Sequence, residues 1–210
     1  EHMVADIVQL DATIDKFLDY ARPDHVTLTP VNLHAVVSSC VYAVQDHREL
    51  QITMSVPEDL NVLADEVELA RVISNLLENA RRYGKTEETG ITTVEIAAKG
   101  RENWVLVKLR DHGPGVPPEQ LSNLTKPFFR GDSARTAAAG AGLGLSIVDK
   151  TVQRMGGIFA LANCSTGGLV AHLQLQRATD LPGGADPKQR LQRPSVKRQL
   201  PRRRAEDRVT

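Results

Sequence analysis

The sequence is poor in aromatic residues, which make up 4% of its 210 residues, and it carries no net charge. A core must therefore rely on leucine, valine, isoleucine and alanine, for which the apolar fraction of 41% suffices. No apolar run is long enough to cross a bilayer, and no signal peptide is visible. These absences predict a soluble piece of one or two domains, which could still belong to a longer, membrane-anchored protein.

Cysteine is also scarce, with Cys40 and Cys164 as the two in the chain, both in apolar segments. Their spacing matches no metal site. Reduced thiols in a cytosolic protein are therefore favoured over a disulfide.

The neutral total hides an uneven distribution of charge. Residues 1–177 contain 17 Lys and Arg against 22 Asp and Glu, whereas residues 178–210 contain 9 against 4. The last stretch has four prolines and almost no apolar periodicity, which predicts a disordered basic tail. A basic tail could contact nucleic acid or anionic lipid, but this one lacks aromatic residues to stack on bases. An inert extension is favoured, and no nucleic-acid partner is expected.

The sequence is organised around a glycine-rich stretch, residues 111–155. An acid in a glycine turn, DHGPGV, follows an alternating apolar run, and Gly140, Gly142 and Gly144 lead into an apolar helix. Glycine lets backbone approach a ligand closely, and amides at a helix start attract phosphate. The pattern predicts a nucleotide site. A dinucleotide fingerprint is rejected because an Ala-rich run, not a strand, precedes Gly140.

Apolar periodicity predicts the other elements. The first helix carries one apolar stripe, so it needs a partner helix to bury it. Helices are expected at residues 3–21, 31–44, 65–83 and 142–155, with a short one from residue 117, and strands at 26–28, 52–56, 62–64, 91–97, 104–110, 158–162 and 169–175.

The helix predicted at residues 65–83 has a distinctive polar face. Asn75, Glu78, Asn79 and Arg82 follow at steps of three and four, so they share one side. Asn is a poor residue in mid-helix, and its amide oxygen suits a Mg²⁺ already bridged to phosphates. A pair of solvated asparagines is the alternative. Asp65 with Glu68 resembles a capping box, and the expected buried side comprises Val67, Ala70, Ile73, Leu76, Leu77 and Ala80.

A small, polar segment at residues 131–141 follows the run KPFFRG and is typical of a lid over a ligand. Phe128 and Phe129 could both be core residues. The favoured interpretation is that one of them anchors the lid.

Four motifs thus occur in order: NLLENARRYG from residue 75, DHGPGV from 111, KPFFRG from 126 and GAGLGLSIV from 140. Together they closely resemble the N, G1, F and G2 boxes of sensor histidine kinases, within the ATPase family that includes gyrase, the Hsp90 chaperones and MutL. The resemblance covers residues 25–177. The first helix resembles the second helix of the dimerisation and phosphotransfer hairpin in osmosensor-type kinases of proteobacteria.

The resemblance implies an α/β fold, a two-layer α/β sandwich of the Bergerat ATP-binding type. A mixed sheet is covered on one face by three helices and is preceded by one helix of the dimerisation hairpin. The implied domains are the partial hairpin at residues 1–22, the ATP-binding domain at 23–177 and the basic tail at 178–210.

The resemblance also implies roles for the phosphate end of the site, with ATP and Mg²⁺ as cofactors. Asn79 and Asn75 would hold Mg²⁺ and Arg82 would meet a phosphate, making these three the catalytic set. Arg130 would add charge. The amides that wrap the triphosphate would come from Gly140, Gly142, Leu143 and Gly144.

At the base end, the resemblance implies that Asp111 accepts a hydrogen bond from the adenine amino group. Gly113 and Gly115 would shape the pocket, and Tyr83 would lie near the adenine or ribose. Phe128, with Phe129, would brace the lid.

The implied reaction transfers the γ-phosphate of ATP to a histidine on the hairpin and then to a response regulator. The acceptor motif, His followed by an acid, Leu, Arg, Thr and Pro, is missing here. The chain is therefore expected to bind ATP without phosphorylating itself, as the soluble, cytoplasmic part of a bacterial inner-membrane sensor that is homodimeric in full length. The six histidines all lie in other contexts: His2, His25, His34, His47, His112 and His172.

Two alternatives stay open. A clamp- or chaperone-type ATPase of the same superfamily would hydrolyse ATP, but such enzymes place a Glu where Asn75 stands, and an amide cannot act as a base. A regulatory module that holds nucleotide without transfer is the other, against which the complete motifs argue.

Overall fold

The computed structural model describes residues 14, 17–18, 25–86, 89–130 and 141–178. In this part of the chain a five-stranded mixed sheet has the order β2-β4-β5-β7-β6. β2 pairs with β4 in parallel and the remaining neighbours are antiparallel. A separate two-stranded sheet pairs β1 (Thr29–Asn32) with β3 (Asn61–Ala64). The five strands are β2 (Leu50–Ser55), β4 (Thr92–Gly100), β5 (Trp104–Asp111), β7 (Leu169–Gln176) and β6 (Ile158–Asn163).

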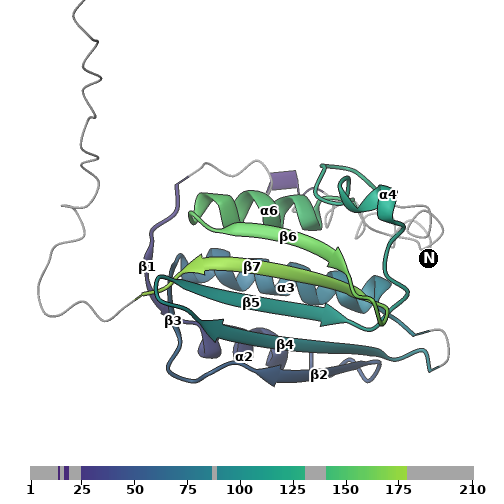
Figure 1. The fold of residues 1–210 in the computed structure, drawn as a ribbon, viewed down its shortest axis with the longest axis horizontal. Helices are drawn as coiled ribbons and strands as arrows, with labels where there is room; N and C mark the ends of the chain where they lie inside the picture. Colours follow the sequence, from purple (N-terminus) through teal and green to yellow (C-terminus); the bar gives the residue numbers. More distant parts are fainter. Residues whose placement is uncertain (1–13, 15–16, 19–24, 87–88, 131–140, 179–210) are drawn as a thin grey trace, which may run out of the picture. The chain divides into compact units, whose positions relative to one another are not determined.

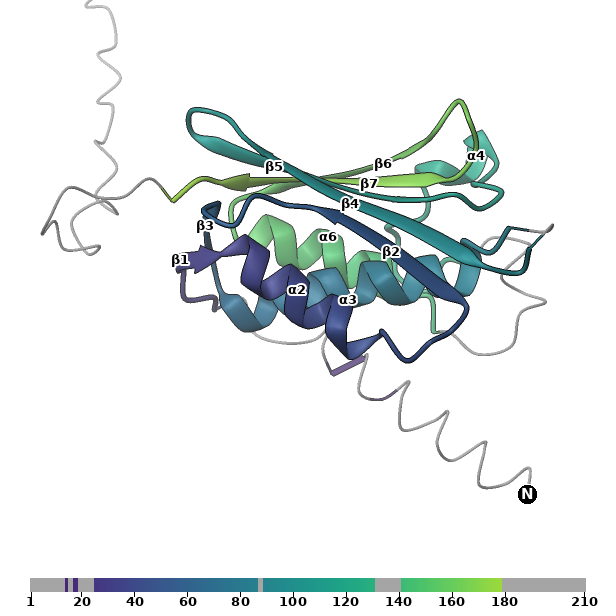
Figure 2. The ribbon, with the colours of Figure 1, turned by 90° about the horizontal axis from the view of Figure 1, so that it is seen from below.

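Three long helices of the described part cover one face of this sheet: α2 (Leu33–Ala43), α3 (Glu66–Tyr83) and α6 (Gly144–Arg154). Figure 1 shows the sheet with the helices behind it, and Figure 2 shows the two layers from below. A single turn, α4 (Pro118–Leu121), follows the β5 end. The predicted α/β sandwich with helices on one face of a mixed sheet is therefore confirmed.

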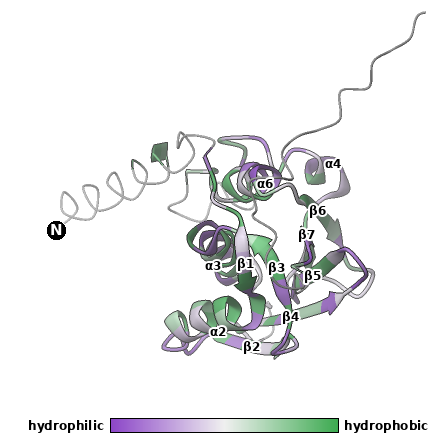
Figure 3. Cartoon of the chain, turned by 90° about the vertical axis from the view of Figure 1, so that its left-hand side faces the viewer, coloured by the Kyte–Doolittle hydropathy of each residue, from purple (hydrophilic) through white to green (hydrophobic). Residues whose placement is uncertain are grey.

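The core between the two layers is aliphatic, as expected from the shortage of aromatic residues. Figure 3 views the layers from one end, coloured by hydropathy. Each helix buries one stripe against alternate residues of the strands, so side chains interdigitate from both sides. The largest fully buried side chains are Leu33, Leu69, Ile73, Leu77, Ile96, Leu143, Ile147, Met155, Leu173, Leu175, Val37 and Val62.

The start of the domain differs from the prediction. Residues 26–28 form no strand, and β1 begins instead at Thr29 and includes Val31, which the sequence placed in a helix. The helix starts after Asn32 because that side chain accepts a hydrogen bond from the amide of Ala35, at 2.8 Å. The cap, rather than the apolar pattern, sets this boundary.

The predicted buried side of α3 was partly wrong. Val67 is 66% exposed, whereas Leu69 and Val72, which were not on the predicted side, are fully buried. Asp65 caps the helix by accepting from the amides of Val67 and Glu68. Val67 lies in this first turn with its side chain toward solvent, whereas Glu68 in the same turn is buried. The side chain of Glu68 is buried in contacts with Arg71 and Arg154.

Most of the predicted first helix, the lid and the tail fall outside the described residues. Ile14, Phe17 and Leu18 are described; they are helical, and each has about half of its surface exposed. Among the helices that the structure describes, none combines the length and the apolar composition needed to cross a membrane.

Candidate nucleotide-binding site

Asp111 is the last residue of β5 and is buried, with 7% of its surface exposed. Its Oδ1 accepts hydrogen bonds from the amides of Gly113, at 3.0 Å, and Leu169, at 3.1 Å. Burial raises the pKa of Asp111, and these two amide hydrogen bonds oppose the rise without cancelling it. In the described part of the chain no hydrogen bond is made to Oδ2. One carboxylate oxygen is therefore held by backbone while the other can accept from a ligand.

Asp111 lines a small cavity that is partly open to solvent. Asn79 is the other polar side chain in its wall, and the rest of the lining is apolar. A flat base with apolar faces and a polar edge fits such a lining, because a few polar groups fix its orientation. The lining residues are Leu76, Asn79, Ala80, Leu109, Asp111, Leu145, Leu161, Leu169 and Ala171.

The backbone packs closely around Asp111. A Cβ at Gly84 would lie 2.8 Å from the Cβ of Asp111, and one at Gly113 would lie 2.6 Å from the Cα of Gly84. Gly168 has φ +88°, and a Cβ there would lie 1.9 Å from the carbonyl oxygen of Asp111. Side chains at these positions would force Asp111 out of place. Gly84 and Gly168 were not predicted as site residues.

The two asparagines of α3 lie at different points of the site. Asn79 lines the cavity, whereas Asn75, one turn earlier, donates from Nδ2 to the carbonyl of Arg71 at 3.0 Å. Its Oδ1 lies beside the start of α6, 3.5 Å from where a Cβ of Gly144 would be. The polar face of α3 therefore runs from the cavity to the N-terminus of α6.

Glu78 holds the arginines that follow it on α3. It forms a two-bond ion pair with Arg81, at 2.8 and 2.9 Å, and also accepts from Nε of Arg82. Burial raises the pKa of Glu78, but the hydrogen bonds from Arg81 and Arg82 outweigh it and lower the pKa to about 2. Arg82, predicted to meet a phosphate, here contacts a carboxylate on its own helix.

The N-terminus of α6 has no side-chain cap. Leu143 occupies the cap position with its side chain buried, so no hydroxyl or carboxylate there bonds the first amides of α6. Amides of this kind suit an anion. Gly142, with φ +69°, accepts from the amide of Phe128 at 3.0 Å, and a Cβ on it would lie 2.8 Å from the carbonyl oxygen of Phe129. The residues that lead into α6 are therefore held to the KPFFRG motif by a backbone hydrogen bond.

Comparison with known proteins agrees with this geometry. Residues 64–179 match the family described as Histidine kinase-, DNA gyrase B-, and HSP90-like ATPase. The chain belongs to this ATPase family. The sensor histidine kinase ZraS of Salmonella typhi is 30% identical over 173 residues, covering 80% of this chain and 35% of ZraS. The histidine-protein kinase BaeS of Escherichia coli (strain K12) is 30% identical over 183 residues, covering 85% of this chain and 37% of BaeS.

The solved structure of the mycobacterial sensor histidine kinase MprB superposes with a TM-score of 0.63 at 26% identity, covering 71% of this chain and 98% of that one. The chain spans little more than a third of the length of ZraS and BaeS. The comparisons show the kinase-type ATPase domain. The narrower, osmosensor-type assignment stays a prediction.

The ATPase domain brings together only some of the predicted site residues. Asp111 and Asn79 share the cavity, and Gly113 and Gly115 belong to the turn that starts at Asp111. Tyr83 is 36% exposed and is not among the cavity-lining residues. Phe128 is 61% exposed with φ 62°, and most of the lid that it was predicted to brace lies outside the described residues. Arg130 is half-buried, and Gly140 lies outside the described residues.

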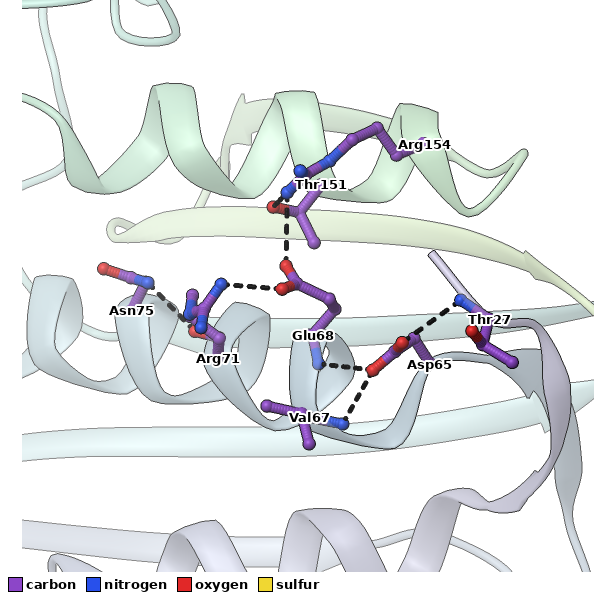
Figure 4. A network of polar contacts seen from close by, with 8 residues as sticks. All are labelled: Thr27, Asp65, Val67, Glu68, Arg71, Asn75, Thr151 and Arg154. Carbon is purple, nitrogen blue, oxygen red and sulfur yellow. Dashed lines mark hydrogen bonds and ion pairs between the residues drawn. The ribbon is translucent and has the colours of Figure 1, made fainter. Parts of the chain in front are cut away.

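A buried polar cluster joins the start of α3 to the end of α6, outside the candidate site (Figure 4). It comprises Glu68, Arg71, Thr151 and Arg154. Glu68 bonds Arg71 at 2.8 Å and reaches across to Arg154 at 3.2 Å, while Arg154 donates to Thr151 at 3.0 Å. Asn75 joins this Glu68 cluster through the carbonyl of Arg71. The cluster thus links the first turn of α3, the helix that carries the two asparagines, to the C-terminal end of α6.

Proposed function

We propose that this chain is the ATP-binding catalytic region of a sensor histidine kinase. It would donate the γ-phosphate of ATP to a histidine on a dimerisation hairpin, for relay to a response regulator. Membership of the histidine kinase-type ATPase family supports the proposal, as do sensor kinases among its relatives. The parent protein would be a homodimeric membrane sensor with this region in the cytoplasm. The domains would be residues 1–22, 23–177 and 178–210.

The observation that carries the proposal is the environment of Asp111. Its Oδ1 is committed to two backbone amides, while Oδ2 is available at a cavity with apolar walls. An ionised carboxylate accepts from the adenine amino group, whereas the matching edge of guanine carries a carbonyl that would repel it. Asp111 would therefore select ATP over GTP.

The remaining residues would position phosphates rather than do covalent chemistry, because phosphoryl transfer depends mainly on orientation and charge neutralisation. The amides of Gly142, Leu143 and Gly144 would hold phosphate oxygens at the start of α6. Arg130 would add positive charge. Arg82, which bonds Glu78 through Nε, would bring positive charge to the phosphates.

A Mg²⁺ ion fits the amide oxygens available on α3. Within the described residues no group of three or more His, Cys, Asp or Glu could hold a metal. A Mg²⁺ ion at this site would also take oxygens from the bound phosphates and from water. The side chains of Asn79 and Asn75 would contribute the neutral oxygens. Bound there, Mg²⁺ would neutralise charge on the phosphates.

The test measures binding by calorimetry in the presence of Mg²⁺. Wild type should bind ATP and should not bind GTP measurably. Asp111→Asn should weaken ATP binding by about a hundredfold, because its amide group presents a donor to the adenine amino group or loses an amide bond to the backbone. Equal affinity for ATP and GTP would contradict the assignment of Asp111.

Asp59→Asn provides a matched control, since Asp59 is exposed in the turn between β2 and β3. It should bind ATP as wild type does.

Hydrolysis by a clamp- or chaperone-type ATPase is the less favoured function, because Asn75 cannot activate a water molecule as a glutamate does.

A further inference from the structure

The turn that begins at Asp111 is held at its far end by a side chain that none of the four motifs contains. Asn163, the last residue of β6, accepts from the amide of Val116 with its Oδ1 at 3.0 Å. Its Nδ2 donates to the carbonyl of the same residue at 2.5 Å. One side-chain amide thus pairs with both backbone groups of Val116, 47 residues away, as a neighbouring strand would.

The turn also fits Asn163 sterically. Gly115 has φ +75°, and a Cβ there would lie 2.9 Å from Oδ1 of Asn163. The chain between Asp111 and Val116, here named the G1 turn, therefore lies directly on this amide. A side chain at residue 115 could not be accommodated without displacing one of the two.

The same hairpin, β6–β7, holds the start of the G1 turn. Leu169 donates its amide to Asp111 Oδ1 at 3.1 Å, and Gly168 packs against the carbonyl of Asp111. Arg110, the residue before Asp111, donates to Thr166 Oγ1 at 2.6 Å and to the carbonyl of Gly167 at 3.1 Å. The hairpin is therefore bonded to both ends of the G1 turn.

We propose that Asn163 is a positioning residue for adenine recognition. It fixes the end of the G1 turn so that the turn keeps its shape beside the base-binding carboxylate. This deepens the proposed function and rests on it. Asn is suited to the task because it offers a donor and an acceptor side by side, whereas a carboxylate offers acceptors alone.

The first variant is Asn163→Ala, which removes both bonds to Val116. Its affinity for ATP should fall roughly tenfold, since two hydrogen bonds that order the turn are lost. Affinity for ADP should fall by the same factor, because the change lies at the base end of the site. Asn163 is exposed, so its removal opens no cavity in the core and the domain should still fold.

The second variant, Asn163→Asp, keeps the acceptor for the Val116 amide but places a carboxylate against the Val116 carbonyl. It should lose at least as much ATP affinity as Asn163→Ala. A side chain that merely filled space would tolerate this isosteric change. Asn103→Ala is the matched control, because Asn103 is an exposed asparagine in the β4–β5 turn whose side chain makes no hydrogen bond in the described part of the chain.

Calorimetry with ATP, ADP and GTP separates the possible outcomes, with a thermal melt of each preparation. Failure of wild type to bind ATP would overturn the proposed function itself. If wild type binds ATP and both Asn163 variants keep its dissociation constant, the positioning role is wrong. A lower binding stoichiometry or melting temperature with an unchanged dissociation constant would likewise overturn it. Weaker binding of ATP and ADP by equal factors, with full stoichiometry, is the expected result.

Discussion

At the scale of single residues, Asp111 is expected to recognise the base, but burying its charge lowers the stability of the folded state. Its carboxylate is buried against apolar side chains, and burial raises its pKa above the usual 3.8. The folded state therefore binds a proton at Asp111 more tightly than the unfolded state does. As the pH rises from 3.8 through the raised pKa, the contribution of Asp111 to stability falls, and above that range the cost is fully present.

This fall in the stability contribution of Asp111 with rising pH gives a prediction for Asp111→Asn. The neutral amide can still accept from Gly113 and Leu169 but avoids the cost of burying a charge. The stability of the variant minus that of wild type should therefore be greater at pH 7 than at pH 3, although the variant is expected to bind ATP poorly. Urea unfolding at both pH values measures the difference. A relative stability of the variant that falls between pH 3 and pH 7 would contradict the argument.

Asp111 and Asn79, which line one cavity, could be placed from the sequence because each lies in a short, ordered pattern. Asp111 follows a strand, and Asn79 repeats the face of Asn75 one turn later. Gly168 and Asn163 could not be assigned in this way. Their importance comes from contacts 57 and 47 residues away, to Asp111 and Val116, and no local pattern records a tertiary contact.

At the scale of elements, α3 and α6 carry most of the residues that are proposed to hold the phosphates. The Glu68 cluster joins them through a carboxylate and an arginine whose side chains are 10% and 8% exposed. Buried ion pairs add little net stability when intact, but losing one partner is costly because the other charge stays buried.

Glu68→Ala should therefore lower the free energy of unfolding by about 3 kcal/mol. It should also weaken ATP binding, since Asn75 and Gly144 lie on the two helices that the cluster joins. Glu66→Ala is the matched control in the same turn: Glu66 is exposed, and its loss should cost less than about 1 kcal/mol through the helix dipole. Urea unfolding of both variants provides the test, and equal losses would show that the cluster adds nothing specific.

The elements themselves could largely be predicted from apolar periodicity, and their errors have physical causes. The helix after β1 was predicted to begin too early, because Val31 fits the apolar stripe of the helix. The helix begins only after Asn32, whose side chain caps it. Val67 was also assigned to the buried stripe of α3, yet its side chain is exposed while those of Glu68 and Leu69 beside it are buried. Periodicity thus identifies an element and its type, whereas capping contacts decide where it starts and which end residues are buried.

At the scale of the whole molecule, the chain contains the nucleotide-binding features without the phosphoacceptor motif. It spans little more than a third of ZraS and BaeS, so the complete reaction would need parts that this sequence does not include. A domain that holds ATP in a transfer-competent way should act on an acceptor supplied separately, because positioning rather than covalent catalysis drives phosphoryl transfer. A module that only holds nucleotide should not.

The decisive experiment mixes the chain with a separately produced dimeric hairpin that contains the acceptor motif, and γ-labelled ATP. Label should appear on the hairpin, at a rate that depends on the concentration of both proteins. Replacing the acceptor histidine by alanine should abolish labelling, and Asp111→Asn should reduce it about as much as it weakens ATP binding.

Intact ATP binding with no label on a hairpin of a kinase related to ZraS or BaeS would favour a regulatory module. Steady release of phosphate that is lost in Asn75→Ala would favour a clamp- or chaperone-type ATPase. Transfer in trans therefore separates the three functions, since each predicts a different destination for the same phosphate.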